Sequence, residues 1–174
     1  ICRRNWYTEI YMGQWVLLLH HNIQSANWVQ AGSTTFQLDM KSSYQQKHKV
    51  FFWMLLHDRV NTRNLLRRKN FVLEAYNCAV SDCQQEETLH HLFWGCPFVQ
   101  QCWDFICPTR TPNLLVLEAF QDLKDKLNYP FYIEIIILGA WAIWITRNNK
   151  ISENIAPSFQ GWKFIFLEEL KLLR

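Results

Sequence analysis

The sequence contains little glycine and proline, with five residues of each among 174. This scarcity argues against a turn-rich β-sandwich. The motifs of several enzyme classes are also missing: there is no Tyr-x-Asp-Asp, no acidic Mg²⁺ cluster, no P-loop and no Gly-x-Ser-x-Gly. Glu86 and Glu87 are adjacent, but neighbours on a helix face different directions, so we expect both on a solvated face rather than as an acid–base pair. We therefore expect no catalytic activity from this chain.

The sequence also has no hydrophobic run of the length that a membrane helix needs. The longest candidate, residues 131–145, is apolar except for Glu134. A transmembrane helix requires about 20 such residues. This segment therefore predicts a buried core helix, and a membrane protein is the weaker interpretation.

Aromatic and basic residues are plentiful. Nine Trp and twelve Phe residues are ample for the packed core of one domain. The formal net charge is only +3, but seven of the 18 Lys and Arg residues fall within 47–69, beside a single acidic residue, Asp58. Such a local concentration points to an anionic partner more clearly than the net charge does.

Four potential metal ligands follow this basic segment with the spacing C-x4-C-x7-H-x4-C: Cys78, Cys83, His91 and Cys96. Three thiols and an imidazole can close a tetrahedral Zn²⁺ site, and a site filled by four protein ligands is structural rather than catalytic. Two other interpretations stay open. The cysteines can be small core residues, or the six cysteines can form disulfides, although a stretch that also holds two histidines suits a metal better. We expect an intracellular location, where thiols stay reduced.

Local patterns predict a mainly α fold, a small helical domain with a zinc-stapled loop and minor β structure near 36–40. Thr62 is a good N-cap, and Pro97 suits the first position of a helix. The predicted helices cover 47–58, a stretch after Thr62, 86–93, 97–106, 113–127, the apolar segment from 131, and 159–173.

The helix after Thr62 predicts a basic face. Its four cations are Arg63, Arg67, Arg68 and Lys69. Such a face suits the phosphates of RNA or DNA, and Phe71 and Tyr76 are candidates for stacking on bases. A solvated face and core packing are the competing explanations for the cations and for the aromatic residues.

A longer pattern surrounds the four ligands. It comprises Trp53, Arg59-Val60-Asn61-Thr62, Leu65, Arg67-Arg68, Cys78, Glu87-Thr88, His91-Leu92-Phe93, Cys96-Pro97-Phe98 and Trp103. Ser42-Ser43-Tyr44 upstream and Trp141, Trp144 and Arg147-Asn148 downstream extend it. The combination resembles the zinc-binding domain at the C-terminal end of plant LINE-type (non-LTR) retrotransposon reverse transcriptases, strongly over 49–104 and weakly over 36–150.

The resemblance implies a non-catalytic accessory domain that binds Zn²⁺ through Cys78, Cys83, His91 and Cys96, with RNA or DNA and other polyprotein domains as partners. It divides the chain into a flank at 1–35, the zinc-binding domain at 36–110 and a helical extension at 111–174. The family usually has C-x2-C, yet position 81 is Ser81, so either Cys83 reaches in from a longer loop or the site is decayed. The alternative is a structural or protein-interaction domain without nucleic-acid binding, a degenerate transposon remnant.

Overall fold

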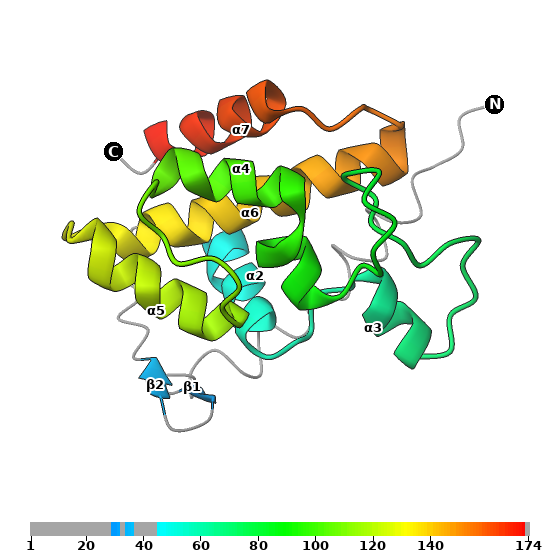
Figure 1. Cartoon of the computed structure of the whole chain (residues 1–174), viewed down its shortest axis with the longest axis horizontal. Helices are drawn as coiled ribbons and strands as arrows, with labels where there is room; N and C mark the ends of the chain where they lie inside the picture. Colours follow the sequence, from blue (N-terminus) through cyan, green and yellow to red (C-terminus); the bar gives the residue numbers. More distant parts are fainter. Residues whose placement is uncertain (1–28, 32–33, 37–44, 173–174) are drawn as a thin grey trace. The chain divides into compact units, whose positions relative to one another are not determined.

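We describe the fold from a computed structural model, which describes residues 29–31, 34–36 and 45–172 (Figure 1). The chain forms two compact units, Ile1–Tyr44 and Gln45–Arg174. In the first unit, β1 (Val29–Ala31) pairs antiparallel with β2 (Thr34–Phe36). The strand predicted at 36–40 meets β2 only at Phe36, and 37–40 lie outside the described residues. The second unit carries the helices and the four candidate ligands.

The apolar segment from 131 forms the central helix of this unit. Helix α6 (Tyr132–Glu153) packs against α2 (Gln46–Leu56), α4 (Pro97–Ile106), α5 (Val116–Leu127) and α7 (Phe159–Lys171), as Figure 1 shows. Ten of its residues are buried, which agrees with the predicted core helix. Among the described residues, no helix combines the length and apolar character needed to cross a membrane.

Large apolar side chains fill the space between these helices. Trp94, Trp103 and Phe120 are at most 1% exposed, and each such side chain stabilises the fold by roughly 1.5–3 kcal/mol. The Trp103 indole N–H donates to the Phe93 carbonyl at 2.7 Å, which satisfies its polar atom inside the core. Gly139 permits the close approach of α4 and α6, because a Cβ there would lie only 2.9 Å from the Ile106 side chain.

Several predicted helix boundaries hold. Thr62 caps α3 (Arg63–Arg68), its hydroxyl accepting from the Leu65 N–H at 3.2 Å. Pro97 is the first residue of α4. The helix expected from 113 begins instead at Val116, because Asn113 has a left-handed backbone (φ 59°) and the Glu118 carboxylate caps the Leu115 N–H. The predicted mainly helical fold class is confirmed for the described residues.

The helix predicted at 86–93 is wrong in its first part. Glu86 pairs with Asn77 in an isolated antiparallel bridge, so the chain is extended there. The helical segment begins only after Thr88, whose hydroxyl accepts from the His91 N–H at 3.0 Å. It continues as a single π-helical turn, η2 (His91–Gly95).

Candidate metal centre

A tight hairpin carries the first two candidate ligands. The Cys78 N–H donates to the Gln85 carbonyl at 2.7 Å, and the Glu87 N–H donates to the Tyr76 carbonyl at 3.0 Å. These bonds turn the chain back on itself, so Cys78 and Cys83 lie on one loop. We call residues 76–87 the zinc loop.

The π-helical turn and the residue that follows it carry the other two candidate ligands, His91 and Cys96. His91 opens η2, and the Cys96 N–H closes it by donating to the His91 carbonyl at 2.8 Å. This i to i+5 bond belongs to a wider turn than that of an α-helix, and such turns are common at functional sites. The adjacent His90 turns elsewhere, because its Nε2 lies 3.0 Å from the Leu114 carbonyl of the segment before α5. The structure therefore selects His91 rather than His90.

The four ligand atoms converge. The Sγ atoms of Cys78, Cys83 and Cys96 and a ring nitrogen of His91 all lie within 4.8 Å of one another. The Cys78 and Cys96 sulfurs are 3.7 Å apart, and a tetrahedron with Zn–S bonds of about 2.3 Å has an edge of roughly 3.8 Å. Cys83 Sγ lies 3.2 Å from His91 Nε2. The donor set and its spacing fit Zn²⁺.

The contact between the Cys78 and Cys96 sulfurs changes the pKa of both thiols. The hydrogen bond with Cys96 lowers the pKa of Cys78 far below its usual value, and His91 acts in the same direction. The same contact, together with burial, raises the pKa of Cys96. The contact between the two sulfurs therefore favours the thiolate form of Cys78, and thiolates are the form that binds metal.

Ser81 occupies the place where C-x2-C spacing would put a cysteine. Its Oγ lies 3.2 Å from Cys96 Sγ and 3.7 Å from Cys78 Sγ. Of the two alternatives that the sequence left open, the structure favours the first, because Cys83 reaches the cluster from the longer loop. The hydroxyl of Ser81 is thus placed to donate to a cysteine sulfur beside the ligands.

A family model described as zinc-binding in reverse transcriptase matches residues 14–103. The chain belongs to this family. The match includes all four converging residues and ends within α4. Neither a curated protein nor a solved structure matches the sequence.

Glu87 braces the site of this family member, and the expectation of a solvated face is wrong for it. It is fully buried and forms an ion pair of 2.6 Å with Arg147 of α6. Its carboxylate also accepts hydrogen bonds from the backbone N–H groups of Arg63 at 3.0 Å and Ala79 at 3.2 Å. The zinc loop, α3 and α6 therefore meet at one carboxylate. The sequence signal for this role was the Arg147-Asn148 element of the resemblance.

The predicted basic face is largely paired inside the fold. Arg67 binds Glu86 at 2.6 Å and covers the Tyr76 ring at 5.5 Å, and Arg68 binds Asp58. The ammonium group of Lys69 donates to the Asn61 side chain at 3.3 Å. Arg63 turns toward the zinc loop and donates to the Asn77 carbonyl at 2.6 Å. Arg63 and Lys69 thus have neutral partners, whereas Arg67 and Arg68 pair with carboxylates.

The remaining predicted residues lie outside the cluster. Phe71 is 57% exposed, whereas the Tyr76 hydroxyl donates to the Phe71 carbonyl at 2.9 Å. Cys102 and Cys107 are free and buried, and burial raises the pKa of Cys102. Both thiols belong to the core around α4 rather than to the metal site.

Proposed function

We propose that the chain binds one Zn²⁺ through Cys78, Cys83, His91 and Cys96, and that this ion is structural. The convergence of the four ligand atoms within 4.8 Å carries the proposal. Four protein ligands leave no coordination position for a catalytic water. When bound, the ion would cross-link the zinc loop, which carries Cys78 and Cys83, to the π-helical turn that carries His91 and ends at Cys96.

Zinc content tests this proposal. Reduced, purified protein should contain one zinc per chain, and Cys96→Ser should lose most of it. Cys102→Ala is the matched control, because Cys102 is equally buried but lies outside the cluster. Chelation should unfold the zinc loop and η2, since structural zinc contributes folding free energy directly. Folded wild-type protein without zinc contradicts the proposal, as does equal zinc in both variants.

We further propose that this unit serves as a non-catalytic accessory domain of a LINE-type retrotransposon reverse transcriptase of plant origin. The family match and the Trp141, Trp144, Arg147-Asn148 element support this. The purified chain should neither incorporate nucleotides nor cleave RNA. Metal-dependent activity of either kind that a point substitution in this chain abolishes would refute the assignment.

We propose that RNA or DNA is the binding partner of this domain. The concentration of positive charge at 47–69 supports it, while the ion pairs of Arg67 and Arg68 favour the alternative of a protein-interaction domain. Affinity for single-stranded RNA measured against salt separates the two. A nucleic-acid-binding domain loses affinity as salt rises, because cations released from the phosphates drive binding. Absence of any measurable affinity at low salt supports the protein-interaction domain.

A further inference from the structure

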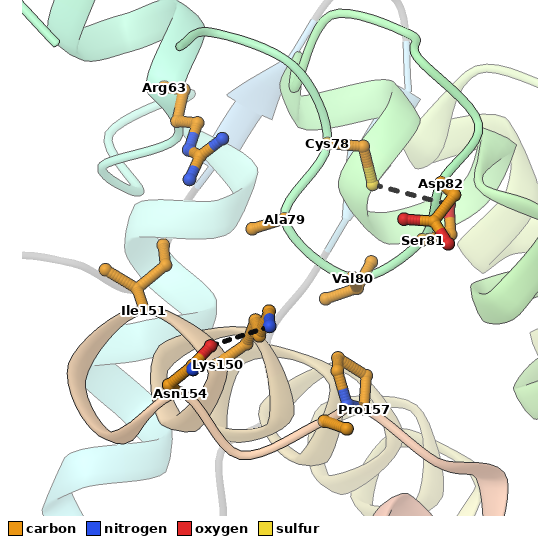
Figure 2. A pocket seen from close by; sticks show the side chains of 11 residues that line it. Arg63, Cys78, Ala79, Val80, Ser81, Asp82, Lys150, Ile151, Asn154 and Pro157 are labelled. Carbon is orange, nitrogen blue, oxygen red and sulfur yellow. Dashed lines mark hydrogen bonds between the residues drawn. The ribbon is translucent and has the colours of Figure 1, made fainter. Parts of the chain in front are cut away.

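A cavity of about 580 Å³ opens beside the candidate metal centre (Figure 2). One wall is the part of the zinc loop that runs from Cys78 to Asp82. The opposite wall is the C-terminal end of α6 with the segment that follows it, and Arg63 of α3 lies at the edge. The volume lies within the range of small-molecule and cofactor sites.

Two cations line this cavity without a carboxylate partner among the described residues. Arg63 donates to the neutral Asn77 carbonyl, and Lys150 donates to the Asn154 side-chain oxygen at 2.8 Å. By contrast, Arg67 and Arg68 on the same helix α3 are each neutralised by a carboxylate. Two cations without a neutralising carboxylate therefore lie at the cavity, and one of them, Lys150, comes from a distant part of the sequence. Lys69, whose partner Asn61 is also neutral, lies outside the lining.

The lining also restricts what kind of ligand fits. Arg63 has five N–H donors, and a guanidinium matches the oxygens of a phosphate in a two-bond geometry. No aromatic ring lines the cavity, so it offers no surface on which a base stacks. Asp82 is the single carboxylate of the lining, and a Zn²⁺ held by three thiolates carries one net negative charge. The long-range attraction of the cavity for an anionic ligand is therefore weak. Such a ligand has to be held by direct contact with the two cations.

We propose that this cavity binds a phosphodiester group of single-stranded RNA or DNA, held by Arg63 and Lys150 and read without base specificity. The inference rests on the proposed nucleic-acid binding. It places the phosphate contacts at the cavity beside the zinc loop rather than on the outer face of α3. Phosphates carry no base identity, so affinity should vary little with sequence.

Two matched double variants of the full zinc-loaded chain test the site. Anisotropy of a labelled single strand of about 16 nucleotides, once as RNA and once as DNA, gives affinity against salt. Arg63→Gln with Lys150→Gln should weaken binding at least tenfold, roughly the value of a charge-assisted bond. It should also lower the salt slope by about 1.4, which is about 0.7 for each lost contact. Arg67→Gln with Arg68→Gln removes the same charge from α3 and should change the slope little.

Two single variants keep the test independent of folding. Lys150→Gln leaves the Arg63–Asn77 contact intact and should lower the slope by about 0.7. Asp82→Asn removes the opposing charge and should tighten binding roughly two- to fivefold. Zinc content and circular dichroism should match the wild type in each case.

The outcomes distinguish the cavity from the broader proposal. Loss confined to the Arg67 and Arg68 variant, with the cavity variants unchanged, overturns the cavity and leaves nucleic-acid binding standing. Wild-type protein that binds neither RNA nor DNA overturns both. A preference of tenfold or more for one base sequence contradicts a contact made through phosphates alone.

Discussion

Ser81 and Cys83 are the two residues of the zinc loop that could complete the ligand set beside Cys78. Ser81 stands at the position where the family usually has its second cysteine, and its hydroxyl lies 3.2 Å from Cys96 Sγ. Cys83 brings the fourth candidate ligand atom to the cluster from two residues further along the loop. Both side chains thus lie close to the place of a second loop ligand, which makes the choice between them testable by exchange.

Cys83→Ala should lose most of the bound zinc, because only three ligands remain. Ser81→Cys in the same background should restore it, since the new thiol would lie beside Cys78 and Cys96. Zinc per chain after equilibration with a competing chelator measures both. Ser81→Ala is the control and should keep its zinc, with somewhat weaker retention because a donor to the sulfurs is lost. Full zinc in Cys83→Ala would show that Cys83 is not a ligand.

At the scale of elements, the ion pair between Glu87 and Arg147 ties the zinc loop to α6. Both side chains are buried, so removing one partner leaves an uncompensated charge in the interior. Arg147→Met should therefore lower the free energy of unfolding by about 3–5 kcal/mol. Arg68→Gln breaks an exposed pair with Asp58 and should cost at most about 1 kcal/mol.

Urea unfolding at saturating zinc measures both values. Glu87→Gln combined with Arg147→Met removes the stranded charge and should be more stable than Arg147→Met alone. If Arg147→Met and Arg68→Gln cost the same, the pair does not hold α6 to the loop.

Most of the helices could be predicted from sequence because their signals are local. Apolar spacing, the Thr62 cap and Pro97 act within a few residues, and α2, α3 and α4 begin within one residue of the predicted positions. The candidate ligands were visible for the same reason, since all four fall in one short stretch.

The rest depends on contacts between distant residues. The extended backbone at Glu86 arises from its pairing with Asn77, which a helical reading of 86–93 ignores. The burial of Glu87 depends on Arg147, 60 positions away. Likewise, the ion pair between Arg67 and Glu86 forms only once the zinc loop returns to α3. No local periodicity encodes these pairings.

For the helical unit as a whole, acid stability depends on a buried histidine where α2, α6 and α7 meet. His48 is 1% exposed, packs edge-on against Trp141 at 5.3 Å and faces Glu169 at 3.3 Å. Burial lowers the pKa of His48 from 6.5 to about 4, a shift that Glu169 partly opposes and Lys47 assists. The unfolded chain therefore takes up this proton at a higher pH than the folded chain does.

The stability that neutral His48 provides is thus complete above pH 6.5 and is lost as the pH falls toward 4. The loss should approach about 3 kcal/mol. His48→Gln cannot take up this proton, so its free energy of unfolding should fall less between pH 7 and pH 4. Acid also protonates the metal ligands, but this affects both proteins, and their difference isolates His48. Parallel pH profiles of the two proteins would contradict the assignment.

The central claim is that a zinc ion, held by three sulfurs and one nitrogen, closes this helical unit. X-ray absorption at the zinc edge of the purified, reduced chain tests it most directly. The account predicts three sulfur neighbours at about 2.3 Å and one nitrogen at about 2.0–2.1 Å, with no water in the first shell. A shell of two sulfurs completed by oxygen, or folded protein that holds no zinc, would contradict it.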